Sequence, residues 1–171
     1  TNIRNYYYKN LVNAGLYVIS SDVLTTITDL RKRDLEKDII LPLIDRKEVY
    51  AYQSSEYVRD AGTPDRYYSI NQDILNGIVE KRNLKNKQKC IFLDRDGTIN
   101  LYKGFVTEAN QFELIPNVEE AIKLINNSEY LAIVITNQPV IARGETSFEE
   151  LNNIHNKMET LLGEKGAYLN A

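Results

Sequence analysis

The sequence contains one cysteine, one histidine and no tryptophan among its 171 residues. A single cysteine, Cys90, excludes an intrachain disulfide framework. Together with His155 it cannot supply the four ligands of a structural zinc site. No apolar run approaches the roughly twenty residues of a membrane-spanning helix, and no signal peptide is evident. We therefore expect a cytoplasmic protein in a reducing setting, with no membrane partner.

The charged residues are unevenly distributed, although the formal net charge is only −3. Residues 76–89 carry a net charge of +4, whereas residues 1–75 carry −1 and residues 90–171 carry −6. The basic stretch lacks interleaved aromatic side chains, so we interpret it as a solvated linker and expect no nucleic-acid partner. The sequence thus predicts two partial domains, 1–75 and 90–171, joined by a linker.

The chemistry is concentrated where the apolar run 90–93 leads directly into Asp94 and Asp96. A short apolar run is typical of a strand buried on both faces, and open α/β sheets bind ligands beyond the carboxyl ends of such strands. Two neighbouring carboxylates repel each other, which favours a Mg²⁺ ion between them. Asp94 could attack phosphorus and Asp96 could shuttle protons, with Gly97 allowing the turn. The alternative is a simple turn stabilised by Asx hydrogen bonds.

A second apolar run, 130–135, ends in Thr136 and Asn137. The segment between the two runs predicts a helix, with Asn117 as N-cap and Glu120 at the third helical position. A right-handed βαβ crossover places the tips of both strands at the same edge of the sheet. Thr136 and Asn137 could there donate hydrogen bonds to a phosphate group, or could form an ordinary loop.

These two motifs resemble those of the haloacid dehalogenase superfamily of phosphatases. The similarity lies in Asp94-Arg95-Asp96-Gly97-Thr98 followed by Thr136-Asn137-Gln138. Residues 93–100 and 141–144 further resemble the branch that contains heptose 1,7-bisphosphate phosphatases and histidinol-phosphatases. The resemblance implies a Rossmann-like domain with a parallel sheet.

The resemblance also implies a role for each matching residue. Asp94 is implied as the nucleophile and a Mg²⁺ ligand. Asp96 is implied as the acid/base and, through its main-chain carbonyl, as a second metal ligand. Thr136 and Asn137 would hold the transferred phosphoryl group, and Arg143 is a candidate for substrate contact.

The chain departs from this branch in several places. It has Pro139-Val140 where the heptose enzymes usually show Ser-Gly, which leaves the substrate open. The lysine and the further acidic motif of the family have no counterpart, so we expect a fragment of a longer protein. An amphipathic helix is predicted from Ser147, with Glu150 completing a capping box. His155 is interpreted as a residue on the surface or flank of this helix.

Residues 1–75 predict a mixed α/β pattern. Strands are expected over residues 13–19 and 49–52 and immediately before Asp60. Helices are expected over residues 23–30, from Asp34 onward, and from Thr63-Pro64 onward.

The order of motifs in this part resembles the carboxyl-terminal region of sugar-1-phosphate nucleotidyltransferases. Asn13-Ala14-Gly15-Leu16-Tyr17 is similar to their sugar-contacting strand, and Asp60-Ala61-Gly62-Thr63-Pro64 to their metal-binding motif. The resemblance implies that Asp60 binds Mg²⁺ and that Asn13 and Gly15 touch the sugar. Alternatively, both motifs are turns, and the Asp60 carboxylate only accepts hydrogen bonds from backbone N–H groups of its loop.

Taken together, these motifs predict the middle of a bifunctional α/β enzyme of nucleotide-activated heptose synthesis. Its partners would be a sugar phosphate and a nucleoside triphosphate, and its cofactor Mg²⁺. Histidinol-phosphate hydrolysis is an alternative activity. A catalytically incomplete module that binds phosphate or a partner is an alternative of another class, and an oligomer is possible.

Overall fold

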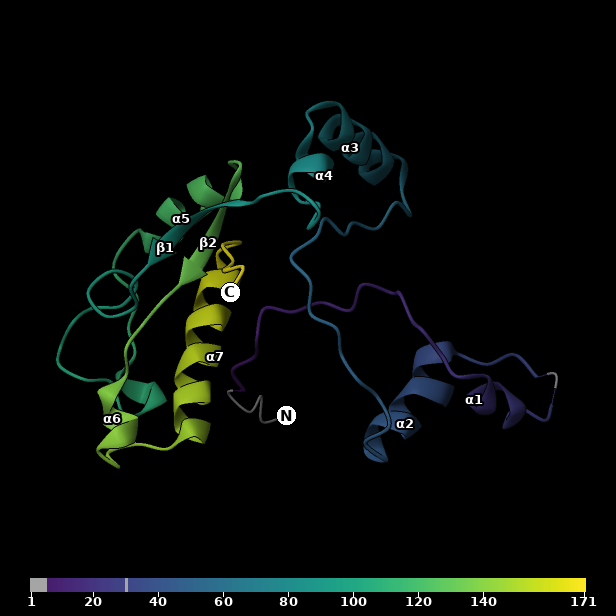
Figure 1. Cartoon of the computed structure of the whole chain (residues 1–171), viewed down its shortest axis with the longest axis horizontal. Coiled ribbons are helices and arrows are strands. Elements are labelled where there is room, and N and C mark those ends of the chain that lie inside the picture. The colour runs from purple at the N-terminus through teal and green to yellow at the C-terminus, as the bar shows by residue number, and fades with distance from the viewer. Residues whose placement is uncertain (1–5, 30) are drawn as a thin grey trace. The chain divides into compact units, whose positions relative to one another are not determined.

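The computed structural model describes residues 6–29 and 31–171 (Figure 1). The chain forms two compact units. The smaller unit is Asn13–Ser55, and the larger one combines Glu56–Ala171 with the segment that ends at Val12. The expected linker 76–89 lies inside the larger unit, and the assignment of two activities to two parts of the chain stays a prediction.

Among its described residues, 13–29 and 31–55, the smaller unit has three short helices: α1 (Ser21–Thr25), the π-helix η1 (Leu35–Ile40) and α2 (Leu41–Asp45). Ser20 caps α1 by accepting a hydrogen bond from the Asp22 backbone N–H, and Asp34 caps η1 by accepting from the Lys37 N–H. The helix predicted from Asp34 is confirmed. The helix predicted over residues 23–30 ends at Thr25, and position 30 lies outside the described residues.

The strands predicted over residues 13–19 and 49–52 are not formed. Backbone N–H and C=O groups of a strand need a neighbouring strand, and within residues 6–29 and 31–171 only β1 and β2 pair in a sheet. Apolar side chains in the first segment also remain in solvent, since Leu16 is 86% and Val18 fully exposed. Without a partner strand or a core, apolar alternation does not make a strand.

The helix predicted from Thr63-Pro64 is confirmed as α3 (Pro64–Leu75). Thr63 caps it, and Pro64 occupies its first turn, where no N–H partner is needed. Residues 57–59, immediately before Asp60, form no strand, so that part of the prediction is wrong. The expected linker also contains a helical turn, α4 (Ile78–Lys81), which begins after Gly77 at φ +70°.

The sheet consists of two parallel strands, β1 (Lys89–Leu93) and β2 (Tyr130–Val134), which lie side by side in Figure 1. Leu93 is in register with Val134, so both strands end at the same edge. The connection contains α5 (Val118–Asn126), as the βαβ prediction requires. The parallel α/β arrangement expected from the sequence is therefore confirmed for this pair.

The last residues of the chain run along the other edge of β2. The Asn170 N–H donates to the Ala132 carbonyl, and the Val134 N–H donates to the Ala171 carbonyl, both over 2.8 Å. The Asn170 side chain accepts from the Ala132 N–H over 2.9 Å. Both edges of β2 are thus hydrogen-bonded.

The expectation that β1 is buried on both faces is wrong. Phe92 is 61% exposed and Ile91 36% exposed. On β2, by contrast, Leu131 and Ala132 are buried. Burial depends on which elements pack against a strand, which an apolar run cannot specify.

The core of the larger unit lies between β2, α5 and α7 (Phe148–Glu164). Its buried side chains come from these elements and from the loops that follow β1 and α7: Ile99, Val106, Phe112, Ile122, Ala132, Ile154, Met158, Leu162 and Ala167. The three from α7 recur every four residues and form one apolar stripe. No helix in the described parts of the chain is long and apolar enough to cross a membrane.

Two predicted helix caps form only in part. Ser147 caps α7 by accepting from the Glu150 N–H over 3.0 Å, but the Glu150 carboxylate accepts from the Ala109 N–H instead of closing a capping box. Ala109 begins the 3₁₀ helix η2 (Ala109–Gln111), so this bond ties η2 to α7. Asn117 stands at the N-cap of α5 with φ +67° and makes no side-chain cap.

Candidate active site

Asp94 lies directly beyond the carboxyl end of β1, where the sequence predicts it. Its side chain is exposed, and its Oδ1 accepts a hydrogen bond from the Arg95 N–H over 2.7 Å. Gly97 turns the chain at φ +81°, and its N–H donates to the Asn100 carbonyl over 2.8 Å. The turn leaves one carboxylate of the motif open to a ligand.

Asp96, two residues on, is largely enclosed, with a side chain 14% exposed. Its Oδ1 accepts from Arg95 Nε over 3.0 Å and from Arg95 Nη2 over 2.9 Å. Its Oδ2 accepts from Arg95 Nη2 over 3.0 Å and from Gln138 Nε2 over 2.7 Å. The two aspartates therefore have different surroundings, as different roles would require.

The loop after β2 reaches the same place. Gln138 Nε2 lies 2.7 Å from Thr136 Oγ1 as well as 2.7 Å from Asp96 Oδ2. The prediction that the two strand tips meet is thus confirmed for Thr136 and Asp96, with Gln138 between them. Asn137 is exposed on the same loop and can turn its amide toward a ligand.

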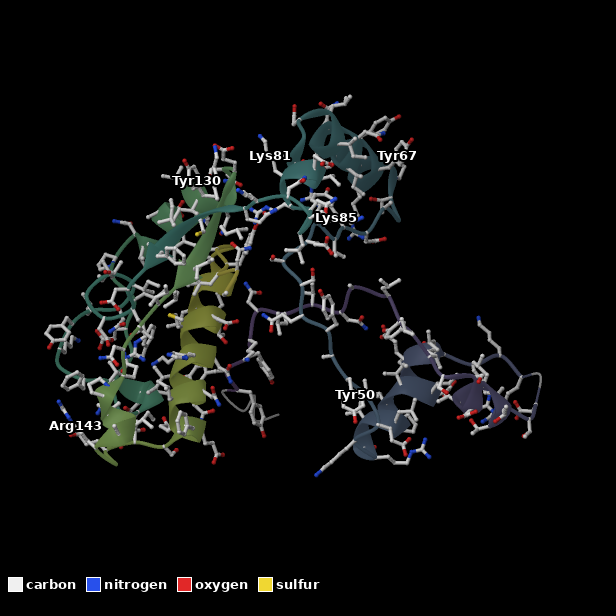
Figure 2. All side chains as sticks on the ribbon, in the orientation of Figure 1. Tyr50, Tyr67, Lys81, Lys85, Tyr130 and Arg143 are labelled. Atoms are coloured by element: carbon white, nitrogen blue, oxygen red, sulfur yellow. The ribbon has the colours of Figure 1, made fainter. Side chains whose placement is uncertain are left out.

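Arg143 lies at the carboxyl end of α6 (Pro139–Ala142), the helix that follows the loop after β2 (Figure 2). Its guanidinium stacks over the Phe105 ring, 5.1 Å from the ring centroid, and Nη1 lies 3.9 Å from Glu145 Oε1. The side chain is about half exposed. It contacts neither aspartate, so its expected contact with substrate stays a prediction.

Three residues without a predicted role in catalysis or binding join the site: Arg95, Gln138 and His155. Arg95 is fully buried, although it stands between two acidic residues. Its place between two carboxylates, two residues beyond an apolar strand, was the available signal for it. His155 lies on the flank of the apolar stripe of α7, as expected, but it is half-buried and also reaches the site, where its Nε2 lies 3.4 Å from Arg95 Nη1. Burial, and next the Arg95 charge, lower the pKa of His155.

The residues at the strand tips fit a Mg²⁺ ion of the kind that binds beside phosphate. Such an ion takes one or two carboxylates and fills its octahedron with water and phosphate oxygens. Asp94 offers an exposed carboxylate, and the main-chain carbonyl of Asp96 is two residues away. Within residues 6–29 and 31–171, no group of three or more His, Cys, Asp or Glu residues gathers to hold a metal by itself. The oxygen donors present therefore suit a site that phosphate completes.

The residues expected to form a second site make local contacts. Asp60 pairs with Arg66 and accepts from the Gly62 N–H over 2.9 Å. Asn13 accepts from the Gly15 N–H over 2.9 Å and donates to Glu36 over 2.9 Å. Both motifs thus have the hydrogen bonds of Asx turns. Their proposed roles with metal and sugar remain predictions.

Comparison with known proteins relates part of the chain to one class of enzyme. No protein-family model matches the sequence. Over 82 residues the chain is 39% identical to the D-glycero-β-D-manno-heptose-1,7-bisphosphate 7-phosphatase of Pasteurella multocida, covering 48% of this chain and 45% of that protein. Over 65 residues it is 48% identical to the enzyme of that name from Salmonella typhi, covering 36% and 35%. The chain spans less than half the length of these relatives.

A solved structure gives a match of similar extent. It is the D,D-heptose 1,7-bisphosphate phosphatase from B. bronchiseptica, complexed with magnesium and phosphate. The sequence identity is 33% and the TM-score 0.47, and the match covers 49% of this chain and 48% of that one.

About half of the chain is therefore homologous to phosphatases of the haloacid dehalogenase class. Within that class, the relatives named above are heptose 1,7-bisphosphate 7-phosphatases. None of them is a nucleotidyltransferase, so the predicted fusion has no support from these proteins.

Proposed function

We propose that residues 90–171 supply the reactive groups of a Mg²⁺-dependent phosphatase acting on a sugar bisphosphate. The observation that carries this proposal is the pairing of an exposed Asp94 with an enclosed Asp96 that Gln138 links to Thr136. The name shared by the relatives supports D-glycero-β-D-manno-heptose 1,7-bisphosphate as the substrate.

The reaction has two steps at phosphorus. In the first, Asp94 attacks the 7-phosphate, the bond from phosphorus to the sugar oxygen breaks, and Asp96 gives that oxygen a proton. A phosphoaspartate forms on Asp94, and heptose 1-phosphate leaves. In the second, Asp96 takes a proton from water, the water oxygen attacks phosphorus, and inorganic phosphate departs from Asp94.

Neighbouring residues orient the phosphoryl group. The Thr136 hydroxyl and the Asn137 amide would donate hydrogen bonds to its oxygens, and Arg143 would attract the second phosphate of the substrate. A Mg²⁺ ion held by Asp94 and the Asp96 carbonyl would neutralise charge on the phosphoryl oxygens. The two strand tips would then provide a nucleophile, an acid/base and hydrogen-bond donors near phosphorus.

The direct test measures inorganic phosphate released from D-glycero-β-D-manno-heptose 1,7-bisphosphate by the full protein with Mg²⁺. Asp94→Asn should abolish release, because an amide cannot attack phosphorus. Asp45→Asn, which changes an exposed aspartate in the smaller unit, is the matched control and should release phosphate at the wild-type rate. Faster turnover of histidinol phosphate would favour the alternative substrate. Binding of Mg²⁺ and phosphate without turnover of either compound would favour the binding module.

A second activity rests on chemistry and on motifs alone. Removing the 7-phosphate leaves a sugar 1-phosphate, which is the kind of molecule that a nucleotidyltransferase activates with a nucleoside triphosphate. We infer that residues 1–75 derive from such an enzyme, with Asp60 as Mg²⁺ ligand and Asn13 and Gly15 at the sugar. The exposed carboxylate of Asp60 is compatible with this role.

A further inference from the structure

Arg95 is the largest of the fully buried side chains, although it lies one residue from an exposed carboxylate. A buried guanidinium is costly unless its charge and its N–H groups are satisfied. Nε and Nη2 of Arg95 satisfy this need by donating three hydrogen bonds of 2.9–3.0 Å to Asp96. The planar fork of an arginine suits this two-point contact, which a lysine cannot reproduce.

Gln138 closes this contact into a ring of hydrogen bonds. Its Oε1 accepts from Arg95 Nη2 over 2.8 Å, while its Nε2 donates to Asp96 over 2.7 Å. One side chain from the loop after β2 thus holds both members of the ion pair. Both oxygens of Asp96 are fixed, so rotation of its carboxylate requires at least two of these bonds to break.

His155 holds Arg95 from a third element, helix α7. Its Nε2 lies 3.4 Å from Arg95 Nη1, the guanidinium nitrogen that does not contact Asp96. A neutral imidazole with its proton on Nδ1 can accept a hydrogen bond there. Residues from the loop after β1, the loop after β2 and α7 therefore meet at Arg95.

We propose that Arg95 is a positioning residue for the phosphatase reaction, which it serves by holding the Asp96 carboxylate in one orientation with Gln138 and His155. This inference rests on the proposed function. Arg95 has no exposed surface, so it acts through Asp96 and does not touch the substrate. Proton transfer depends closely on geometry, and a displacement of about 1 Å can reduce a rate by roughly 100-fold.

The first experiment compares Arg95→Lys with wild type in the full protein, using phosphate release from the heptose bisphosphate. Lysine keeps the positive charge but lacks the planar guanidinium that holds both oxygens of Asp96. The kcat should therefore fall roughly 100-fold, while KM stays within about threefold. Arg46→Lys, an exposed arginine of the smaller unit, is the matched control and should leave both unchanged. A wild-type kcat for Arg95→Lys would overturn the proposal.

Two variants of His155 separate positioning from packing. His155→Gln keeps an acceptor for Arg95 and should retain most of kcat, whereas His155→Leu fills similar space without an acceptor and should lower kcat. Thermal unfolding shows whether both variants fold. Equal kcat values for two folded variants would contradict the role of His155 as a partner of Arg95.

A measurement without turnover distinguishes this proposal from the proposed function. His155 is the only histidine of the sequence, so its imidazole nitrogen signals in ¹⁵N NMR are unambiguous. They should show the proton on Nδ1 in wild type, and they should change in Arg95→Lys. A wild-type proton on Nε2 would overturn the contact whatever the activity. If wild type shows the expected tautomer but releases no phosphate, the proposed function fails, and the positioning role falls with it.

Discussion

Gln138 Nε2 lies 2.7 Å from Asp96 Oδ2 and joins the loop after β2 to the loop after β1. The two residues are 42 positions apart, and only the parallel pairing of the strands brings them together. The same amide also contacts Thr136, so one side chain links the expected acid/base to the expected phosphate-binding loop.

Removing the Gln138 amide should destabilise the fold. Gln138→Ala deprives Arg95 of one acceptor and Asp96 of one donor in a largely enclosed place. Because Arg95 and Asp96 still bond to each other, we expect the two losses together to cost about 1–3 kcal/mol. The free energy of unfolding, measured in urea, should therefore fall by about 1–3 kcal/mol. Gln53→Ala, at an exposed position, is the control and should change it by less than about 0.5 kcal/mol. Equal effects of the two substitutions would mean that the hydrogen bonds of Gln138 to Arg95 and Asp96 add nothing to stability.

Stability should depend on pH through His155. Burial and the nearby Arg95 charge lower the pKa of His155 when folded; Lys9 adds to this effect and Asp96 opposes it. The unfolded chain therefore binds more protons than the folded one at pH values between its unfolded pKa, about 6.5, and the lower folded pKa. The stability that the fold gains from holding His155 neutral is fully present above about pH 6.5, and it is lost as pH falls through the folded pKa of His155.

The measurement for this pH effect is the free energy of unfolding of wild type and of His155→Gln between pH 5 and 8. The difference between the two proteins should change below about pH 6.5, with wild type losing more stability on acidification. A constant difference across this range would show that the pKa of His155 is not lowered by folding.

The core between α5, β2 and α7 should dominate the stability of the larger unit. Leu162 of α7 is 1% exposed, whereas Leu124 of α5 is 74% exposed. Leu162→Ala should therefore cost about 2–5 kcal/mol through lost burial and a cavity, and Leu124→Ala less than about 0.5 kcal/mol. Chemical unfolding of the two variants compares the same substitution in two helices. A small effect at Leu162 would place the core elsewhere.

The two proposed activities should be separable by mutation. Asp60→Asn should impair transfer of a nucleotidyl group to a sugar 1-phosphate while leaving phosphate release unchanged, and Asp94→Asn should do the reverse. The reason is that each carboxylate would hold the Mg²⁺ of its own reaction. Both rates are measured on the full protein, by nucleotide-sugar formation and by phosphate release. Loss of both activities in either variant would contradict two independent sites.

The local part of the site could be predicted from the sequence. The apolar runs, the acidic residues that follow them and the glycine at the turn are neighbours in the chain, and they place Asp94 and Thr136 at strand tips. The same reasoning failed in residues 1–75, where segments such as 13–19 and 49–52 form no strand. Strand formation needs a hydrogen-bonded neighbour, which a single segment does not specify.

The sequence by itself determined the parallel βαβ unit and the presence of Asp94 and Asp96 beyond its first strand. Local turn residues and the preferred handedness of the crossover are enough for that. Only the tertiary structure decided that Arg95 is buried, with Gln138 and His155 as its partners. These partners lie 43 and 60 residues away from it, so their contacts depend on how β2 and α7 pack around the loop after β1. The ion pair with Asp96 joins neighbours in the chain, whereas the contacts that complete the burial of Arg95 come from distant residues that no local pattern specifies.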